Sequence, residues 1–328
     1  MAVKTLWGIL GTGNIASKFA TALNSMDDAE LAGVGSRAQE SADAFGDRFG
    51  VARRYDSYER LAADPDIDLV YISTPHDCHK ENAILCFEAG KGVLCEKPFT
   101  INRGEAEEVT AAASKAGVFL MEAMWMRYIP AVQQAMRWIR EGAIGDARMV
   151  QASFGFRVDE VEGRLFDPAA GGGSLLDVGI YPITLAHLAF GRAPDRIESI
   201  PYLGHNGVDE QAAILFGYEG GGVALLGSAV RTKTPLDGTI MGTEGMITLH
   251  DTFWNASRVS LTLNDQKPQT VELPLDCNGY EYEAREAQRC FHEGLLESPL
   301  MTHATTLEVM KIMDWIRADW GLKYPMEG

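Results

Sequence analysis

A glycine turn near the amino terminus has the spacing of a phosphate-binding loop. Residues 11–16, Gly-Thr-Gly-Asn-Ile-Ala, read G-x-G-x-x-A between an apolar run, Thr5–Leu10, and a helical pattern, Asn14–Ser25. The first glycine permits a tight turn, the second lets the backbone approach a pyrophosphate, and a small third residue lets helix and strand pack closely. The N–H groups at the helix start can then hold phosphate oxygens. In this strand–turn–helix context the motif predicts a dinucleotide site; the alternative is a glycine turn that binds nothing.

The end of the second strand indicates which dinucleotide is bound. NAD-binding proteins place an acidic residue about 20 positions further on, where it binds the ribose hydroxyls. Here that place is held by Ser36 and Arg37. A guanidinium can bind the 2′-phosphate of NADP, which a carboxylate would repel. We therefore expect NADP as the cofactor, the alternative being that Arg37 is a solvated residue at a helix start.

Two polar segments follow later strands of the same pattern. Residues 73–79, Ser-Thr-Pro-His-Asp-Cys-His, come after one apolar strand, and Glu96-Lys97-Pro98 comes after the next. Open α/β sheets bind their ligands at the carboxyl ends of strands. Both segments are therefore expected beside the dinucleotide.

Three segments resemble a known family. Glu-Lys-Pro at this distance behind the glycine turn resembles the family that includes glucose-fructose oxidoreductase and inositol dehydrogenase (Gfo/Idh/MocA). Segments 96–99 (Glu-Lys-Pro-Phe), 121–127 (Met-Glu-Ala-Met-Trp-Met-Arg) and 171–182 (Gly-Gly-Gly-Ser-Leu-Leu-Asp-Val-Gly-Ile-Tyr-Pro) resemble its branch of dimeric dihydrodiol dehydrogenases and NADP-dependent D-xylose dehydrogenases. The resemblance covers essentially the whole chain. The wider family usually has Asp-x-x-x-His on this helix, whereas Asp177 and Tyr181 stand here, as in that branch.

The resemblance implies an α/β protein of two domains. Residues 1–123 would form a Rossmann domain with a doubly wound parallel sheet, and 124–328 a substrate-binding α/β domain with a large, mostly antiparallel sheet. That sheet often serves as an oligomer interface in the family, so a homodimer is expected. The lysine of Glu-Lys-Pro, Lys97, would lie at the active site. The expected cofactor-binding residues are Gly11, Gly13, Asn14, Ile15, Ser36, Arg37, Thr74, Pro75, His79, Glu96 and Lys97.

Lys97, Asp177 and Tyr181 have the chemistry that alcohol oxidation requires. Residues at i and i+4 of a helix share one face, so Asp177 and Tyr181 can reach one substrate. A base must take the hydroxyl proton, and a phenol of pKa about 10 is a poor one near neutrality. An ammonium about 4 Å away, at an effective dielectric of about 20, favours the phenolate by about 4 kcal/mol, which brings this pKa to about 7. We expect Lys97 to supply that charge and to bind the reacting oxygen, with Asp177 orienting substrate or lysine.

Alternative roles remain for each of these residues. Lys97 could itself transfer the proton, or be a surface cation. Ser174-x-x-Asp177 has the form of a capping box, so Asp177 could serve only the helix N–H groups. Tyr181, which precedes Pro182, could be a core aromatic.

Four further residues are candidates for substrate contact. Aromatic residues line an apolar pocket in the dihydrodiol dehydrogenase branch, which implies this role for Trp125, Phe154 and Trp254, although large aromatics are often plain core. Arg127 could meet a hydroxylated or anionic substrate, or pair with a carboxylate. No metal site is expected, since His76 and His79 lack a further ligand at metal spacing.

The pattern along the chain supports this organisation. Up to residue 123, five short apolar runs alternate with helical patterns, which predicts a parallel sheet with right-handed crossovers. Beyond it come a helix, Pro130–Arg140, a strand, Ala147–Phe156, and a glycine-opened helix, Ser174–Phe190. A succession of strands then follows between Ile197 and Leu273, with a hairpin turn at 219–222 (Glu-Gly-Gly-Gly). Two last helices are expected near Glu281–Leu296 and Thr305–Trp320.

Composition excludes several classes of partner. The chain has 328 residues, 46% of them hydrophobic, and a formal net charge of −17, which would repel nucleic acid and anionic membranes. No signal sequence and no uninterrupted apolar stretch of about 18 residues are recognisable. The five cysteines are odd in number and without a C-x-x-C pair, which fits reduced thiols in the cytoplasm.

The sequence thus predicts a cytoplasmic NADP(H)-dependent oxidoreductase acting on a CH–OH or C=O carbon of a sugar or cyclic diol. Two alternatives remain. A regulatory protein that senses NADPH without turnover would not need Lys97, Asp177 and Tyr181. An enzyme whose cofactor never leaves, as in glucose-fructose oxidoreductase, would retain bound nucleotide on purification.

Overall fold

The computed structural model describes residues 4–159 and 161–328. Backbone contacts divide the chain into two compact units, Met1–Trp125 with Asp276–Leu307, and Met126–Leu275 with Glu308–Gly328. The segment Asp276–Leu307 packs in the first unit, whereas the sequence placed all of 124–328 in the second domain.

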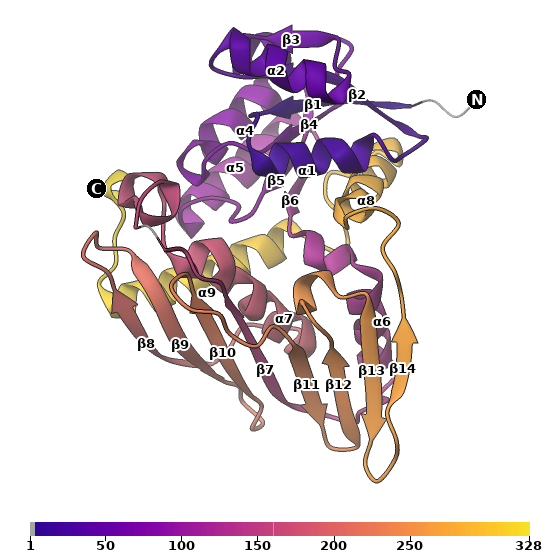
Figure 1. The fold of residues 1–328 in the computed structure, drawn as a ribbon, viewed down its shortest axis with the longest axis vertical. Helices are drawn as coiled ribbons and strands as arrows, with labels where there is room; N and C mark the ends of the chain where they lie inside the picture. Colours follow the sequence, from indigo (N-terminus) through magenta and orange to yellow (C-terminus); the bar gives the residue numbers. More distant parts are fainter. Residues whose placement is uncertain (1–3, 160) are drawn as a thin grey trace. The chain divides into compact units, whose positions relative to one another are not determined.

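The first unit contains a six-stranded parallel sheet flanked by helices (Figure 1), as predicted. Its strand order is β3-β2-β1-β4-β5-β6, in which the chain starts at the centre and winds outward in both directions. The central strands are buried on both faces, as their unbroken apolar sequences require. The strands are β1 (Thr5–Leu10), β2 (Ala29–Gly35), β3 (Arg53–Tyr55), β4 (Leu69–Ile72), β5 (Gly92–Glu96) and β6 (Leu120–Ala123).

Six helices belong to this unit. They are α1 (Asn14–Leu23), α2 (Gln39–Phe49), α3 (Tyr58–Ala62), α4 (His79–Glu88), α5 (Arg103–Ala116) and α8 (Tyr280–His292). The predicted Thr5–Leu10 and Asn14–Ser25 lie within two residues of β1 and α1, and the five predicted apolar runs are strands of this sheet, but β3 and α3 were missed. The reason is local: β3 is a short, half-buried strand that begins with two arginines, so it has no apolar run to reveal it.

Helix α8 comes from far along the chain and completes the first unit. The Trp7 indole N–H, on β1, donates to Gln288 Oε1 on α8 at 3.1 Å. The side-chain amide of Asn278, just before the helix, donates to the Lys18 carbonyl on α1 at 2.8 Å. Because Trp7 is fully buried, its only polar group needs such a partner.

The second unit contains an eight-stranded sheet of order β14-β13-β12-β11-β7-β10-β9-β8, in which only β7 and β10 pair in parallel. Helices α6 (Pro130–Arg140), α7 (Ile180–Phe190) and most of α9 (His303–Trp320) lie along one face of the sheet (Figure 1). The predicted mostly antiparallel sheet is therefore confirmed. The strands are β7 (Ala147–Gly155), β8 (Arg196–Leu203), β9 (Asp209–Gly217), β10 (Val223–Ala229), β11 (Gly238–Gly242), β12 (Gly245–Leu249), β13 (Arg258–Leu263) and β14 (Gln269–Glu272).

One stretch of this unit differs from the predicted regular helix. Residues Leu175–Gly179 (η5) form a π-helical turn that continues directly into α7. Single π turns of this kind are frequent at functional sites. Asp177 lies in the π turn and Tyr181 in the first turn of α7, so the i, i+4 spacing spans a change of helix type.

The stretch around α7 is apolar on all sides. The segment Pro168–Phe190 is long and apolar enough to cross a membrane by length and composition alone. Its most apolar 18 residues have a mean hydropathy of 1.3, but 83% of them are buried within the structure. A helix that is hydrophobic all round needs cover on every side, and here the chain itself provides it.

Candidate active site

The glycine turn after β1 has the shape that a phosphate requires. Gly11 has a φ of +101°, and a Cβ there would lie 3.1 Å from the Ser73 carbonyl oxygen, so only glycine fits. At Gly13 a Cβ would meet nothing within 4 Å. No side chain caps the start of α1, and its first turn has no acidic residue. Asn14 and Ile15, which begin the helix, therefore offer backbone N–H groups to an anion in the space that Gly13 leaves open.

Ser36 and Arg37 lie at the end of β2, the neighbouring strand. Ser36 is buried, and its Oγ accepts a weak bond from the Ala38 N–H at 3.5 Å. Arg37 is exposed, and within residues 4–159 and 161–328 no carboxylate forms a salt bridge with it. A guanidinium in this state can take a phosphate without first breaking an ion pair.

The segment after β4 is tied to the segment after β5. The buried ring of His79 lies with Nδ1 3.0 Å from the Pro98 carbonyl and Nε2 2.9 Å from the Thr74 carbonyl. Thr74 Oγ1 accepts from the Asn82 side-chain amide at 2.9 Å. Pro75 then starts the short turn that leads into α4. His79 thus fixes the two strand ends, which is a structural contact beside the predicted cofactor site.

Glu96 is the last residue of β5 and directly precedes Lys97. Its buried carboxylate accepts from the Lys97 N–H at 3.0 Å and from the Tyr71 hydroxyl on β4. Burial raises the pKa of Glu96, and the nearby Lys97 ammonium opposes that rise. Tyr71 in turn stacks on Phe19 of α1, with ring centroids 3.7 Å apart. The backbone that carries Lys97 is therefore rigidly held.

A second buried carboxyl group lies near Glu96. Glu283 of α8 is fully buried, and neither of its oxygens has a hydrogen-bond partner among the described residues. Burial and the neighbouring Glu96 raise the pKa of Glu283 well above its usual value. Two carboxyl groups in one dry site cannot both be ionised at low cost, so Glu283 holds its proton. The sequence did not single out Glu283, because its neighbours come from β4 and β5.

We predict opposite stability effects for two glutamates of α8. Glu281 and Glu283 are both fully buried, but Glu281 accepts from the N–H groups of Cys277, Asn278 and Gly279. Glu281→Met should destabilise the protein, because it orphans these donors. Glu283→Met should stabilise it by about 1–3 kcal/mol, the cost of an unsatisfied buried polar group.

The pH dependence follows from the raised pKa of Glu283. A carboxyl whose pKa is higher in the folded state stabilises the fold below the unfolded pKa, and loses that stabilisation as the pH rises through the folded value. The gain from Glu283→Met should therefore grow with pH above about 5. Chemical denaturation of both variants at pH 5, 7 and 9 measures this. Equal destabilisation by both substitutions would refute the assignment.

Asp177 is held by a residue that sequence reasoning missed. Its Oδ1 accepts from the Arg164 guanidinium at 2.8 Å. Arg164 belongs to a short turn, Arg164–Phe166, whose Phe166 packs on Val178 in a buried cluster. The capping alternative for Ser174 and Asp177 is not what the structure shows, since the Ser174 hydroxyl and the Leu175 N–H both donate to Asp209.

Tyr181 lies in a group of aromatic rings. Phe154 of β7 and Trp254 stack with centroids 3.5 Å apart, and the Tyr181 ring lies 5.4 Å from the first and 5.9 Å from the second. The structure thus brings together two of the three aromatic residues expected at the substrate. Phe154 is half-buried, so this group presents an apolar ring surface around one phenol.

The other two candidates lie elsewhere. Trp125 belongs to the first unit, where it stacks on Tyr280 at the start of α8 at 4.5 Å. Arg127 is buried in the second unit, and its carbonyl accepts from the Gln133 side chain. Burial lowers the pKa of His187 on α7 against the opposing hydrogen bond with Glu308, and the Arg127 charge lowers it further.

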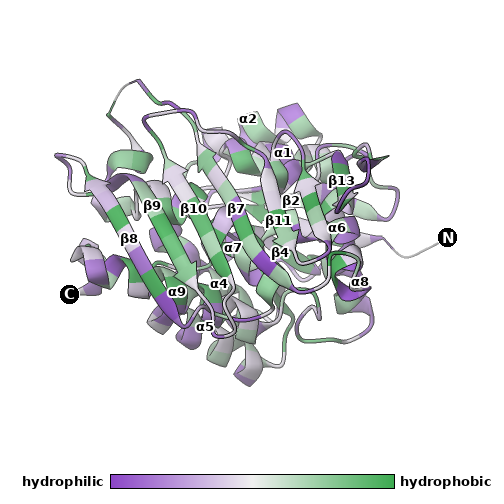
Figure 2. Ribbon diagram, turned by 90° about the horizontal axis from the view of Figure 1, so that it is seen from below, coloured by the Kyte–Doolittle hydropathy of each residue, from purple (hydrophilic) through white to green (hydrophobic). Residues whose placement is uncertain are grey.

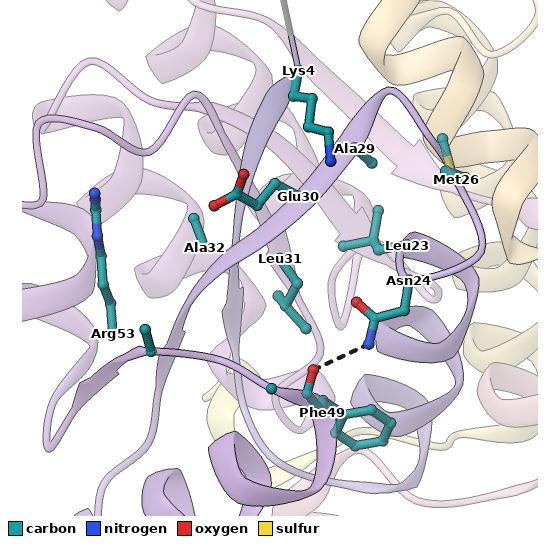
Figure 3. Close-up of a pocket in the computed structure, with 12 residues that line it drawn as sticks. Lys4, Leu23, Asn24, Met26, Ala29, Glu30, Leu31, Ala32, Phe49 and Arg53 are labelled. Carbon is teal, nitrogen blue, oxygen red and sulfur yellow. Dashed lines mark hydrogen bonds between the residues drawn. The ribbon is translucent and has the colours of Figure 1, made fainter.

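A pocket of about 420 Å³ in the first unit (Figure 3) is not lined by any residue of the glycine turn. It is lined by the start of β2, by Lys4 ahead of β1 and by Asn24 and Phe49 at the ends of two helices. These are the amino ends of the strands, whereas the turn follows the carboxyl end of β1. This pocket is therefore not the nucleotide site. Within the described residues, no group of three His, Cys, Asp or Glu side chains could hold a metal ion.

The fold and these strand-end groups define a nicotinamide-dinucleotide-dependent oxidoreductase with a Rossmann domain. Residues 5–124 match the model of the oxidoreductase family with an NAD-binding Rossmann fold, and residues 132–248 match the GFO/IDH/MocA C-terminal domain. The chain belongs to the GFO/IDH/MocA family, as its sequence motifs predicted.

Among its relatives are trans-1,2-dihydrobenzene-1,2-diol dehydrogenases. That of Xenopus laevis is 35% identical, covering 98% of this chain and 99% of the relative, and that of Homo sapiens is 32% identical, covering 98% of both. A 3-ketoreductase from Actinomadura kijaniata, solved with NADP and TDP-benzene, is 26% identical with a TM-score of 0.84, covering 96% of this chain and 97% of the other. The protein is thus an oxidoreductase.

Proposed function

We propose that the protein is an NADP(H)-dependent dehydrogenase that interconverts a secondary alcohol and a ketone on a cyclic diol, with sugars as the second substrate class. The observation that carries the substrate class is the Tyr181 ring against the stacked Phe154 and Trp254. A surface of aromatic rings that includes one phenol suits a substrate with a small ring that is apolar on its faces and hydroxylated at its edge. The relatives named as dihydrobenzenediol dehydrogenases support the same class.

The choice of NADP rests on Arg37. An exposed guanidinium that forms no salt bridge with the described carboxylates, next to Ser36, fits a 2′-phosphate. We further propose that the first unit binds the nucleotide and the second binds the substrate.

When bound, the nicotinamide accepts or donates the hydride. Tyr181 Oη takes the proton of the substrate hydroxyl during oxidation and returns it during reduction. The Lys97 ammonium stabilises the phenolate and binds the reacting oxygen. Arg164 orients the Asp177 carboxylate through their salt bridge, so that Asp177 can accept a hydrogen bond from a second hydroxyl.

A substrate panel tests this function. Cyclic trans-diols, D-xylose and other aldoses are offered with NADP or with NAD, and absorbance at 340 nm is followed in both directions. We expect the highest kcat/KM for a cyclic diol with NADP. Release of nucleotide from the purified protein upon denaturation would instead favour a cofactor that does not leave. A panel without any turnover would refute the proposal.

We also propose a homodimer formed through the uncovered face of the eight-stranded sheet. Figure 2 looks onto this sheet and shows hydrophobic residues along β9 and β10. Leu215 and Leu225 face one another across these strands and are 52% and 40% exposed, and Ile200 on β8 is 77% exposed. An apolar surface of this kind is typical of a subunit interface.

The free cysteines support a reducing, cytoplasmic location.

A charge on this face should separate the subunits. Leu225→Lys is expected to convert a dimer to a monomer, because two lysines would be buried at a twofold interface. Light scattering after size exclusion measures the mass. Leu296→Lys, at an exposed leucine of the first unit, is the control and should leave the dimer intact. A monomeric wild-type protein would contradict the proposal.

A further inference from the structure

Asp209 is a buried carboxylate that the proposed chemistry does not use. It begins β9, is fully buried, and lies directly against the glycine run that precedes the π turn. At Gly173, which has a φ of +115°, an added Cβ would lie 2.2 Å from Asp209 Oδ1. The glycine is therefore required both by its conformation and by the carboxylate.

One oxygen of this carboxylate holds the start of the helix. Asp209 Oδ2 accepts from the Ser174 hydroxyl and from the Leu175 N–H, each at 2.7 Å. The Ser174 oxygen is also 2.8 Å from the Ser228 hydroxyl on β10. Leu175 is the first residue of the π turn. A charge at this position also interacts favourably with the positive end of the helix.

The second oxygen has no such role. Asp209 Oδ1 has no hydrogen-bond partner among the residues that the structure describes. A buried carboxylate is costly to remove from water, so the presence of Asp209 here calls for an explanation. The residues that it fixes supply one, since Asp177 and Tyr181 follow Leu175 at two and six positions.

We propose that Asp209, in its ionised form, is a positioning residue that fixes the π turn and thereby sets the directions of Asp177 and Tyr181. The proposal rests on the proposed function for its catalytic consequence. The carboxylate accepts two hydrogen bonds more strongly than a protonated acid would, so protonation loosens the helix start. Asp209 acts through other residues and does not itself touch the substrate.

The surroundings of Asp209 place its titration near neutrality. Burial raises the pKa of Asp209 to about 7, against the bonds from Ser174 and Leu175, which lower it. Tyr324 faces it from the C-terminal segment, where its hydroxyl donates to the Gly172 carbonyl at 2.7 Å. The charged groups around it are Arg317, which pairs with both Glu327 and Asp314 beside Tyr324, and Glu210 of β9, which pairs with Arg231.

The test compares Asp209→Asn with Glu210→Gln. Glu210 is the adjacent buried residue but pairs with Arg231 and does not contact the helix start. Asp209→Asn should lower kcat about tenfold or more above pH 8, because a charge-assisted acceptor becomes a neutral one. Nucleotide affinity should be unchanged, since the proposed nucleotide residues lie in the first unit. Glu210→Gln should stay within about twofold of wild type in kcat.

Hydrogen exchange provides a readout independent of turnover. After correction for intrinsic rates, the amides of 175–182 should exchange faster in Asp209→Asn than in wild type, and faster in wild type at pH 6 than at pH 8. Should Asp209→Asn fold poorly, Ser174→Ala removes one of the two donors. It should lower kcat by a few fold and move the protection midpoint above pH 7, because the carboxylate loses a stabilising bond.

The outcomes are distinguishable. Faster exchange with reduced kcat supports the proposal. Unchanged exchange in Asp209→Asn overturns it, and so does faster exchange with full kcat. A wild-type protein that turns over no substrate would refute the proposed function, while the exchange data would still decide whether Asp209 fixes the helix.

Discussion

Replacing Tyr181 by phenylalanine is expected to lower kcat about 10³-fold while changing the KM for nucleotide little. The substitution removes only the hydroxyl, and general acid–base groups contribute typically 10²–10⁴-fold. The ring remains, so its contacts with Phe154 and Trp254 and the apolar surface are kept. Steady-state kinetics with the best substrate of the panel measures the effect.

The control for this variant is Tyr218→Phe. Tyr218 is also buried in the second unit, stacks on Phe190 of α7 at 4.0 Å, and has a hydroxyl without a hydrogen-bond partner in the described part of the chain. Losing that hydroxyl should leave kcat unchanged. Lys97→Met should cost about as much as Tyr181→Phe, and the double variant little more, because residues that act as a unit are not additive. Near-full turnover of Tyr181→Phe would leave Lys97 as the proton-transfer group.

Replacing Arg37 by alanine is expected to lower kcat/KM for NADP about 10- to 100-fold, with little change for NAD. A hydrogen bond to a charged group contributes about 1.5–3 kcal/mol, which corresponds to this range. Arg37 forms no salt bridge within 4–159 and 161–328, so its removal should not destabilise the first unit. Kinetics with both nucleotides gives the ratio of efficiencies.

Two comparisons sharpen the Arg37 result. Arg37→Lys keeps the charge but loses the paired donor geometry, so its ratio should fall between wild type and Arg37→Ala. Arg285→Ala removes an exposed arginine of the same unit that pairs with Asp276. It should leave the ratio unchanged. If Arg37→Ala kept the wild-type ratio of NADP to NAD efficiency, the 2′-phosphate would be bound elsewhere.

Local patterns were enough to predict the parallel sheet. Apolar runs bounded by turns located β1, β2 and β4 to β6, because a strand buried on both faces needs such a run. The short edge strand β3 has no apolar run, and the π turn at Leu175–Gly179 has the same composition as a regular helix. Neither could be predicted from sequence pattern alone.

The motifs likewise pointed to the residues that we propose contact the ligands, and not to the residues that hold these side chains in place. Asp177 was visible through its family motif, but its partner Arg164 lies on an irregular turn without a recognisable spacing. The role of Asp209 depends on its contact with Leu175, 34 residues away in the sequence. The role of Glu283 depends on Glu96, which lies on a distant strand. Pattern reasoning from one sequence does not reach such pairs.

The return of α8 to the first unit affects how the protein is made. On a ribosome the glycine turn and all six strands of the parallel sheet emerge within the first 125 residues, yet Trp7 obtains its indole acceptor only when Gln288 emerges. Until then, the nascent nucleotide-binding half exposes the surface that α8 later covers, while the second unit is synthesised between its two parts. Completion of the first unit therefore waits until α8 has been made, after every strand of the eight-stranded sheet.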